Sequence, residues 1–490
     1  MSEKLESSKY LFFCIALMVV AISCKQPETI TINADPVSAP NTDTASTDTA
    51  TASQSADFMQ LNMGELHAIH SLDPVFAKNT STMRALQLLY EGLVKYNEEG
   101  NITPAVAKTW SVSDDSLTYT FTLQDDAFYQ DSDIFPNGIG RKLVARDVRF
   151  VFERLAKATV PPHGAELFMS VLGFEPYFQE QHNVYNPEER KLPTIRGIAT
   201  PNDSTVSFRL QDKDPHFIQK LASPYALIYP REAVRSNNFT PIGSGPYKLS
   251  QVEGQTRFIF SKFKNYHGEA PGLNRIDIIT GQSESELFQS FVRGEIDFIP
   301  EMGPQMLKGL MADRNNLKPV YQNQYKLYRN SGRLHYIMHY NDGSDYSRTS
   351  AIALAQLVDS TTSITETGDF IDLMVMQKDS ANTAIADTTT FSYTEDPFTS
   401  WLLGTLNRKI SAQSVIQMQN IKTPTRDIGL YFEQYFSFTS SRYMISDTNA
   451  LINLVVYPAG LSNGTAKGIH TNTFPWWIDL RNATISDSNN

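Results

Sequence analysis

The chain of 490 residues is 41% hydrophobic and 11% aromatic, enough apolar material for more than one hydrophobic core. Its 42 Lys and Arg against 53 Asp and Glu give a net charge of −11, and no basic stripe interrupts it, which argues against nucleic acid as a partner. Only Cys14 and Cys24 carry thiols, so a disulfide framework or a thiolate metal site in the folded body is excluded. These features predict a globular protein of about two or three domains.

The N-terminal segment has the pattern of a secretion signal. Residues 11–22, LFFCIALMVVAI, are apolar over less than the roughly 20 residues that a membrane-spanning helix needs. The AISC that follows resembles the lipobox of bacterial lipoproteins, which implies a signal peptide over 1–23 and a lipid on Cys24. An uncleaved N-terminal anchor is the alternative, and it leaves the body on the same side of the membrane.

Residues 24–57 are rich in Thr, Ser, Ala, Asp and Pro. Such a stretch cannot bury enough apolar surface to offset the entropy of ordering it, so it predicts a disordered tether. The globular composition begins at Phe58. From there, helical spacing predicts helices over 81–93 and 143–158, and alternation of apolar residues predicts strands over 116–124 and 203–211.

Residues 280–299 carry the clearest local signals. Ser283 and Glu286 form a capping box, and Gly294 ends the predicted helix before a strand over 295–299. Short alternating strand and helix units favour α/β lobes with a mixed sheet over a sandwich or a bundle.

The stretch PIGSGPYKL, 241–249, lacks the spacing of a nucleophile elbow, and the chain has no phosphate-binding G-x-x-x-x-G-K-[ST] loop. His67 and His70 could share one helical face, but H-E-x-x-H is absent, and two partly exposed imidazoles are the simpler interpretation. Most acidic clusters lie among turn residues. We therefore expect no metal, no cofactor and no catalysis.

Six segments in one order resemble a known family: 71–74, 88–124, 143–155, 241–249, 264–271 and 292–299. Together they are similar to the extracellular solute-binding protein family 5, the oligopeptide- and dipeptide-binding lipoproteins that serve ABC importers. The likeness fades after about residue 342.

The resemblance implies an α/β, two-lobed periplasmic-binding-protein-like fold of type II, with mixed sheets and an inserted N-terminal subdomain. The implied limits are 58–95 with 200–305 and 440–490 for lobe I, 96–199 for the inserted subdomain, and 306–439 for a shortened lobe II. Residues 454–485 look like the return into lobe I, with Trp476 and Trp477 expected on opposite faces of a strand.

The resemblance also implies ligand-binding residues in lobe I. Ile69, His70 and Ser71 match a strand that pairs with the ligand backbone, and Tyr247 and Tyr266 are expected to face the ligand. For each tyrosine the alternative is a core residue with a paired hydroxyl. By the same analogy PIGSGPYKL is a bend, in which Gly243 and Gly245 adopt unusual dihedrals.

In lobe II, residues 391–406 are similar to the family's stretch where an aspartate holds the ligand's ammonium group. Ser392 or Tyr393 stands at that position here, so either Glu395 or Asp396 substitutes or the ligand has no free amine. Trp401 completes the predicted ligand-binding set.

The implied function is that of a substrate-binding lipoprotein that captures a peptide or related small solute and presents it to an ABC permease and ATPase. We expect a monomer, held by its lipid at the periplasmic or extracellular face of a bacterial membrane. The alternatives are a two-lobed sensor or interaction lipoprotein not coupled to transport, and a hydrolase of cell-surface peptides.

Overall fold

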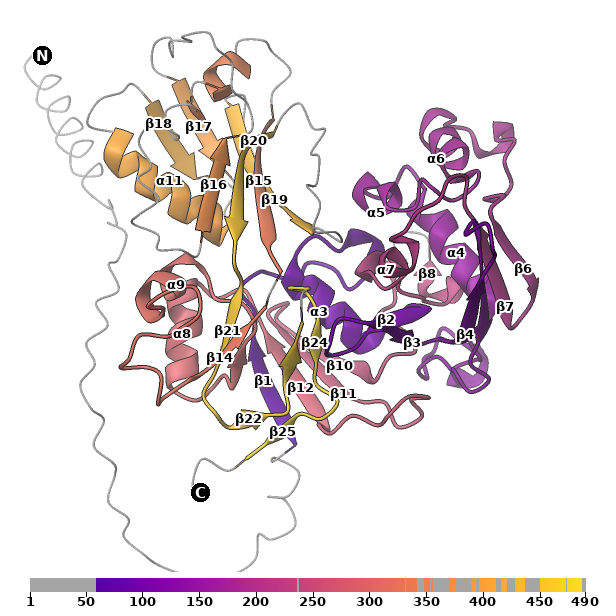
Figure 1. The fold of residues 1–490 in the computed structure, drawn as a ribbon, viewed down its shortest axis with the longest axis horizontal. Coiled ribbons are helices and arrows are strands. Elements are labelled where there is room, and N and C mark those ends of the chain that lie inside the picture. Colours follow the sequence, from indigo (N-terminus) through magenta and orange to yellow (C-terminus); the bar gives the residue numbers. More distant parts are fainter. Residues whose placement is uncertain are drawn as a thin grey trace, which may run out of the picture. The chain divides into compact units, whose positions relative to one another are not determined.

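The structure is a computed structural model. It describes residues 59–235, 238–330, 332–341, 348–352, 354–355, 371–375, 389–393, 396–410, 416–420, 428–436, 450–472 and 474–486. All of these belong to one compact unit, Asp48–Asn490, and their larger sheets have seven, four and six strands (Figure 1).

The seven-stranded sheet is mixed. Its strands, in spatial order, are β10 (Tyr247–Glu253), β11 (Arg257–Lys262), β12 (Arg275–Ile279), β1 (Gln60–Gly64), β13 (Phe298–Ile299), β21 (Ala459–Ser462) and β14 (Lys326–Arg329). Strand β1 runs parallel to β12 and β13, whereas the other pairs are antiparallel. The helices of these segments are α3 (Thr80–Leu89), α8 (Glu284–Val292) and α9 (Pro304–Leu310).

The four-stranded sheet is antiparallel. It contains β4 (Ala107–Val112), β5 (Thr118–Leu123), β7 (Thr205–Arg209) and β6 (Ile198–Asn202) in that order. Its neighbouring helices are α4 (Ala145–Leu155), α5 (Pro162–Glu166), α6 (Phe174–Asn183) and α7 (Phe217–Leu221). In Figure 1 these elements form the magenta group.

The six-stranded sheet contains β16 (Ile371–Val375), β20 (Ala450–Val456), β15 (Leu334–Asn341), β19 (Ile428–Phe436), β17 (Thr389–Tyr393) and β18 (Ile416–Asn420). Strand β17 is parallel to its two neighbours. Helix α11 (Pro397–Ile410) follows β17. The two-lobed architecture with mixed sheets, expected from the resemblance, is therefore confirmed.

The remaining described strands form two-stranded pairs. They are β2 (Val94–Tyr96) with β3 (Ile102–Pro104), β8 (Val234–Arg235) with β9 (Asn238–Phe239), β22 (Ala466–Lys467) with β25 (Thr484–Ile485), and β23 (His470–Thr471) with β24 (Ile478–Asp479). In the described part of the chain, no helix has the length and apolar character needed to cross a membrane.

The two large sheets are joined by a pair of crossings. Strand β14 pairs with β21 in the seven-stranded sheet, and β15 pairs with β20 in the six-stranded sheet. The backbone N–H of Asn330 in one crossing donates to the carbonyl of Pro458 in the other at 3.4 Å. Figure 1 shows the yellow strand β20 leading into β21. The chain thus enters and leaves the six-stranded sheet side by side.

Strand pairing bears on the lobe limits, which remain proposals. Because β7 pairs with β5 and β6, we propose that the inserted subdomain extends to about residue 209 instead of 199. We likewise propose the crossings at 330–333 and 457–458 as the limits of lobe II, in place of 306 and 440.

The local predictions hold where sequence periodicity is strong. The strands over 116–124 and 203–211 correspond to β5 and β7, and the helix over 143–158 corresponds to α4. The capping box is present, since Glu286 N–H donates to Ser283 Oγ at 3.3 Å and Ser283 N–H donates to Glu286 Oε2 at 2.9 Å. Gly294 has a φ of 74°, as a helix stop requires.

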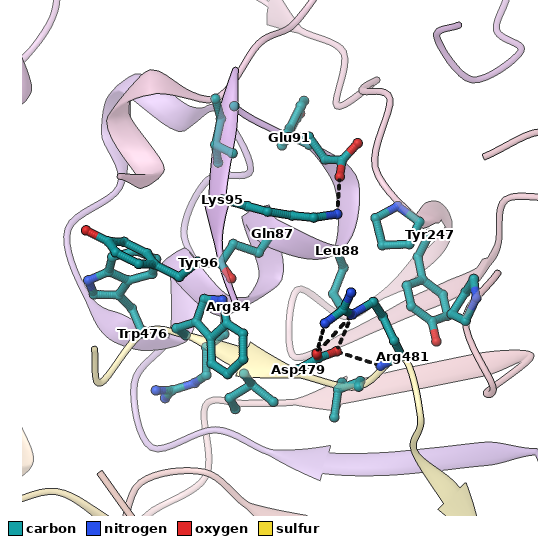
Figure 2. Close-up of a pocket in the computed structure, with 18 of the residues that line it drawn as sticks. Arg84, Gln87, Leu88, Glu91, Lys95, Tyr96, Tyr247, Trp476, Asp479 and Arg481 are labelled. Carbon is teal, nitrogen blue, oxygen red and sulfur yellow. Dashed lines mark hydrogen bonds and ion pairs between the residues drawn. The ribbon is translucent and has the colours of Figure 1, made fainter. Parts of the chain in front are cut away.

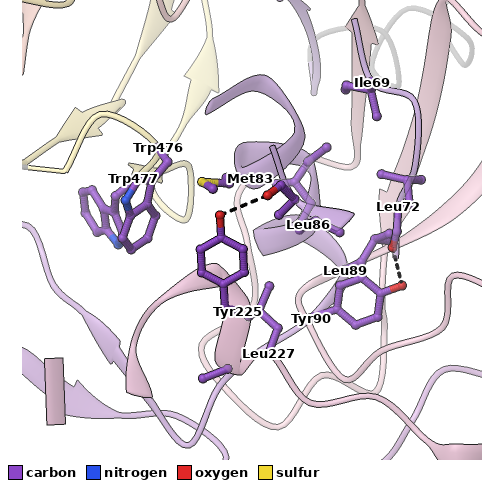
Figure 3. Close-up of a cluster of buried hydrophobic side chains, with 14 of the residues drawn as sticks. Ile69, Leu72, Met83, Leu86, Leu89, Tyr90, Tyr225, Leu227, Trp476 and Trp477 are labelled. Atoms are coloured by element: carbon purple, nitrogen blue, oxygen red, sulfur yellow. Dashed lines mark hydrogen bonds between the residues drawn. The ribbon is translucent and has the colours of Figure 1, made fainter. Parts of the chain in front are cut away.

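Two local predictions are wrong. Trp476 and Trp477 lie in a turn and not on a strand, because Pro475 precedes them and Trp477 N–H donates to the Phe474 carbonyl at 2.9 Å. Both indole rings are buried, so neither faces outward. Figure 3 shows them in the hydrophobic core with Met83 and Leu86 of α3 and with Tyr225, whose Oη donates to the Ala77 carbonyl at 3.0 Å.

The second concerns PIGSGPYKL. Gly243 and Gly245 are absent from the glycines with positive φ, so unusual dihedrals do not explain them. Instead a Cβ at Gly243 would lie 2.1 Å from the Leu89 carbonyl oxygen, and one at Gly245 would lie 2.6 Å from the Leu89 carbonyl carbon. The bend needs glycine because it packs directly on the end of α3, where Gly245 N–H donates to the Leu89 carbonyl at 2.8 Å.

Candidate functional site

Polar side chains of the two large sheets meet at one buried point, which we call the interlobe cluster. It consists of Glu65, His67, Arg84, Glu301, Tyr336, Asp396 and Gln434. The first four belong to segments of the seven-stranded sheet and α3, and the last three to β15, the start of α11 and β19. Strand β1 ends at Gly64, just before Glu65 and His67. A Cβ at Gly64 would lie 2.6 Å from Leu287 Cδ1, so glycine lets the chain pass close to α8 on its way to the cluster.

Arg84 neutralises part of the acidic charge. Its Nε donates to Glu65 Oε1 at 2.8 Å, and its Nη2 lies 2.5 Å from Glu65 Oε2 and 3.4 Å from Glu301 Oε2. Thr80 Oγ1 also donates to Glu301. Burial alone would raise the pKa of Glu301, but His67, Arg84 and Thr80 together lower it to about 2, so this carboxylate stays ionised.

His67 lies between carboxylates of the two lobes. Its Nε2 is 3.5 Å from Glu301 Oε1, and its Nδ1 is 3.6 Å from Asp396 Oδ2. Burial by itself lowers the pKa of this imidazole and Arg84 opposes protonation, but the hydrogen bond and charge of Glu301 and the charge of Asp396 outweigh both, so the pKa is raised. The cluster contains three carboxylates and one permanent cation, which makes it favourable for a second cation.

The hydrogen bonds of the Gln434 amide depend on the protonation state of His67. Its Oε1 accepts from Thr80 N–H at 2.9 Å, and its Nε2 lies 2.9 Å from His67 Nε2. Neutral His67 can accept that bond, whereas protonated His67 would place two donors face to face. Protonation therefore requires the amide to turn, which breaks the bond from Thr80 N–H and the bond that Nε2 donates to Tyr336 Oη, at a cost of about 1 kcal/mol each. The charge-assisted interactions with Glu301 and Asp396 outweigh these two neutral bonds.

Asp396 has two roles. As the residue before Pro397, it caps α11: its Oδ1 accepts from Phe398 N–H at 2.9 Å and from Thr399 N–H at 3.3 Å. Its other carboxylate oxygen faces His67. Burial raises the pKa of Asp396 more than the His67 charge and the two capping bonds lower it. A cation beside this carboxylate would therefore be favoured, since it relieves this penalty.

The predicted residues of lobe I lie in two places. Ile69 is buried, His70 is exposed and Ser71 is half-buried, and all three lie outside any strand, shortly after the cluster residue His67. Ser71 Oγ accepts from Asp73 N–H at 3.1 Å. They follow the cluster residue His67 in the chain, and none of the three is among the residues that line the cavity with Tyr247 and Tyr266.

Tyr247 and Tyr266 line a cavity of about 120 Å³, which shares Arg84 with the interlobe cluster (Figure 2). Tyr247 Oη donates to the Leu273 carbonyl at 3.3 Å, the geometry of a core tyrosine with a paired hydroxyl. Tyr266 Oη donates to Glu91 Oε1 at 2.6 Å, and Lys95 Nζ donates to the same oxygen at 3.1 Å. None of the lining residues comes from the six-stranded sheet, so this cavity is not formed between the two lobes.

The predicted residues of lobe II adjoin Asp396. In β17, Ser392 is buried with its Oγ unpaired among the described residues, and Tyr393 is half-buried. Trp401 is half-buried in α11. Glu395 and Cys24, the predicted site of lipidation, lie outside the described residues. The described residues contain no group of three or more His, Cys, Asp and Glu arranged to hold a metal.

Sequence reasoning missed most of the cluster. His67 was expected to be a partly exposed imidazole, which is wrong because the contacts with Glu301 and Asp396 bury it. The residues that were not considered are Glu65, Arg84, Glu301, Tyr336 and Gln434. A usable signal existed in Glu65 and His67, two ionisable residues directly after a buried strand, where the chain reaches the edge of a sheet.

The fold defines a class, the two-lobed periplasmic-binding-protein-like folds with mixed sheets. Residues 101–344 match the model of the middle region of the bacterial extracellular solute-binding proteins, family 5, and the chain belongs to this family. A crystal structure of *Haemophilus influenzae* OppA in complex with the peptide RPPGFSPFR aligns with 88% of this chain and 99% of its own, at a TM-score of 0.66 and 14% identity. That likeness shows the fold.

Curated relatives differ in their ligands. The dipeptide-binding protein DppE of *Bacillus subtilis* is 26% identical over 270 residues, which are 53% of this chain and 46% of the relative. The nickel-binding periplasmic protein of *Escherichia coli* is 25% identical over 223 residues, 44% of this chain and 36% of the relative. The chain thus matches less than half the length of these relatives, and membership of the family leaves the solute open.

Proposed function

We propose that this chain is the substrate-binding subunit of an ABC importer, which captures a peptide or related small solute between its lobes and delivers it to a membrane permease and its ATPase. The observation that carries the proposal is the interlobe cluster, where side chains of both large sheets meet at buried ionisable groups. A solute that contacts both lobes only when they are closed shifts the protein towards the closed form. The proposal includes no catalytic step.

The proposed ligand contacts are Asp396 with its neighbours in lobe II and the segment Ile69–Ser71 in lobe I. Asp396 is the proposed partner of a solute ammonium group, because its carboxylate faces His67 of the other lobe and carries a raised pKa that a cation would relieve. Glu395, Ser392, Tyr393 and Trp401 are proposed as further contacts. Tyr247 and Tyr266, which line the cavity of about 120 Å³, are proposed as contacts only for a solute that reaches it.

The first test identifies the solute. The chain is purified from a cell envelope, and mass spectrometry identifies the small molecules that are released when it is unfolded. We expect peptides or another small solute in amounts close to one per chain. If no molecule co-purifies and calorimetry with di- and tripeptides shows no heat of binding, the proposal fails.

The second test replaces Asp396 by Asn. Because Asn caps a helix as well as Asp does, this change removes the charge and keeps the cap of α11. We expect about 10- to 100-fold weaker binding of peptides with a free amino terminus, the value of a hydrogen bond to a charged group. N-acetylated peptides and the thermal unfolding temperature serve as controls and should change little. Equal losses for both peptide classes contradict an ammonium contact.

We also propose that Cys24 carries a lipid that holds the chain at the periplasmic or extracellular face of the membrane, as a monomer. The AISC pattern before the tether supports this. Cys24→Ala should leave the chain without a lipid, which mass spectrometry measures. The variant should also leave the membrane fraction, provided that the signal peptide is still cleaved or that the lipid is the only anchor. Co-purification of permease subunits with the lipidated chain would support transport, and solute binding without them would favour the sensor.

A further inference from the structure

His67 is placed where a solute cation is expected. Its imidazole is 6% exposed, and its two nitrogens face carboxylates of opposite lobes, Glu301 on one side and Asp396 on the other. The backbone around it is held as well, since Thr280 Oγ1 donates to the His67 carbonyl at 2.6 Å and His67 N–H donates to Ser81 Oγ at 3.2 Å. The ring therefore has a defined position between the lobes.

We propose that His67 is an internal cation that a solute displaces: in its protonated form it joins Asp396 to Glu301 and holds the lobes together until the cationic group of a solute takes its place. This inference rests on the proposed function and adds that pH controls lobe closure and solute binding. The site would select solutes that carry a cationic group able to replace an imidazolium.

The groups that face His67 decide its charge. From lobe I these are Glu301, which favours protonation of His67, and Arg84, which opposes it. The guanidinium of Arg84 is paired with Glu65. From lobe II they are Asp396, the hydroxyl of Tyr336 at 3.1 Å and the amide of Gln434. Two carboxylates attract the proton and one already-paired cation repels it, so the charge balance favours the imidazolium in the closed form.

The sign of the pH dependence follows. Since the pKa of His67 in the closed form is raised above the value of a free imidazole, about 6.5, its contribution to closure is complete below that value and is lost as the pH rises through the raised pKa. The raised pKa of Asp396 acts in the same direction, because the closed form binds the proton more tightly. Glu301, with a pKa of about 2, opposes closure only in strong acid.

The first experiment uses no solute. It tests whether protonated His67 holds the lobes together, and its result does not depend on the proposed function. Spin labels are attached to cysteines introduced at Val292 in α8 and Gly404 in α11, both exposed, with Cys14 and Cys24 replaced by Ser. The protein is unfolded and refolded to remove any bound solute, and the distance between the labels is measured from pH 5.5 to 8.5. We expect a shift from a short to a longer distance as the pH rises, and mainly the longer distance at all pH values in His67→Gln.

A second experiment tests the displacement by solute. When His67 leaves the cluster its pKa returns towards about 6.5, so binding of alanylalanine near pH 7 should release up to about one proton. Calorimetry in buffers of different ionisation enthalpy measures this number. The affinity of the wild type should rise by up to about tenfold per pH unit, whereas His67→Gln should release no proton and show a flat profile.

His470→Gln is the matched control. His470 also faces a carboxylate, with its Nδ1 3.2 Å from Glu98 Oε2, but it is 42% exposed and far along the chain from the cluster. This variant should keep the wild-type pH profile. Should His67→Gln retain both the pH-dependent distance and the proton release, the inference is overturned. If no solute binds but the distance still changes with pH in the wild type and not in His67→Gln, the proposed function fails. The inference that protonated His67 holds the lobes together is then still supported.

Discussion

At the scale of single residues, Asp73 of the SLDP stretch links lobe I to the inserted subdomain. Its two carboxylate oxygens receive Arg154 of α4 at 2.7 and 2.5 Å, and Arg154 also donates to Tyr229 Oη at 2.9 Å. Asp73 caps the short 3-10 helix Pro74–Phe76 in addition. Because both charges are almost completely buried, each depends on the other.

We expect Asp73→Asn to destabilise the protein by about 3 kcal/mol, since it leaves Arg154 buried beside a neutral partner while the amide can still serve as a cap. Denaturant unfolding of the full chain measures this. Asp203→Asn is the control, because Asp203 pairs with Arg146 at 3.4 Å where both side chains are about 70% exposed; its effect should stay below about 1 kcal/mol. Similar losses for the two variants would contradict this account of the buried pair.

Residues 71–74, SLDP, stand out in the sequence only as one of the six segments that resemble the family. The partner of Asp73, Arg154, lies 81 positions further along. The periodicity of α4 places Val148, Val151 and Phe152 in the core, as observed, but it gives no sign that Arg154 on the same helix is buried. Buried charges are rare and depend on a distant partner, so local patterns do not reveal them.

At the scale of elements, two glycines have opposite roles. Gly245 packs against the backbone of Leu89, whereas a Cβ at Gly404, within α11, would meet nothing within 4 Å. We expect Gly245→Ala to destabilise the protein by about 1–3 kcal/mol through overpacking. Gly404→Ala should stabilise α11 by up to about 1 kcal/mol, the helix-propensity difference. Thermal unfolding of both variants gives the two signs, and the same sign for both contradicts the argument.

Glu284 at the start of α8 makes stability depend on pH. Its Oε1 accepts from Met306 N–H in α9 at 2.6 Å, but burial outweighs this bond and the one from Gln305 and raises the pKa of Glu284 to about 7. The folded chain then binds a proton that the unfolded chain releases, so this group's contribution falls as the pH rises from about 4.5 to 7.

We therefore expect the change that Glu284→Gln makes in the free energy of unfolding to be more favourable at pH 8 than at pH 5. The difference should be roughly 3 kcal/mol, the value of a pKa difference of this size. Urea unfolding at the two pH values checks this. Glu286→Gln, two residues further and exposed in the capping box, should not show a difference of this sign. An equal effect of Glu284→Gln at both pH values would falsify the buried-carboxylate explanation.

Elements with strong periodicity were predictable, and those shaped by distant packing were not. The capping box and Gly294 give the ends of α8 within the sequence itself. The close approach of Gly243 and Gly245 to Leu89 cannot be read from PIGSGPYKL, because the neighbour lies about 150 residues earlier. For the same reason the interlobe cluster, assembled from six separate stretches of chain, was only partly predictable through Asp396.

At the scale of the whole molecule, Tyr457 stabilises the crossings between the sheets. The guanidinium groups of Arg314 and Arg333 lie 4.1 and 5.5 Å from the centre of its ring. Each cation–π contact at a partly exposed site contributes about 0.5–1 kcal/mol. We expect Tyr457→Leu to speed hydrogen exchange at Asn330 and nearby amides of both crossings, with α8 unchanged as the internal control. Uniform acceleration over the chain would instead indicate global destabilisation.

The side-by-side crossings restrict how the lobes can move. A hydrogen-bonded ribbon of two strands is stiff within its own plane and yields mainly by twisting or by folding across its width. Relative rotation should therefore have one easy axis, set by the few peptide units near Asn330 and Pro458. Closure along that axis brings Glu301 and Asp396 to the two nitrogens of His67, so this single buried imidazole responds to whether the lobes are together.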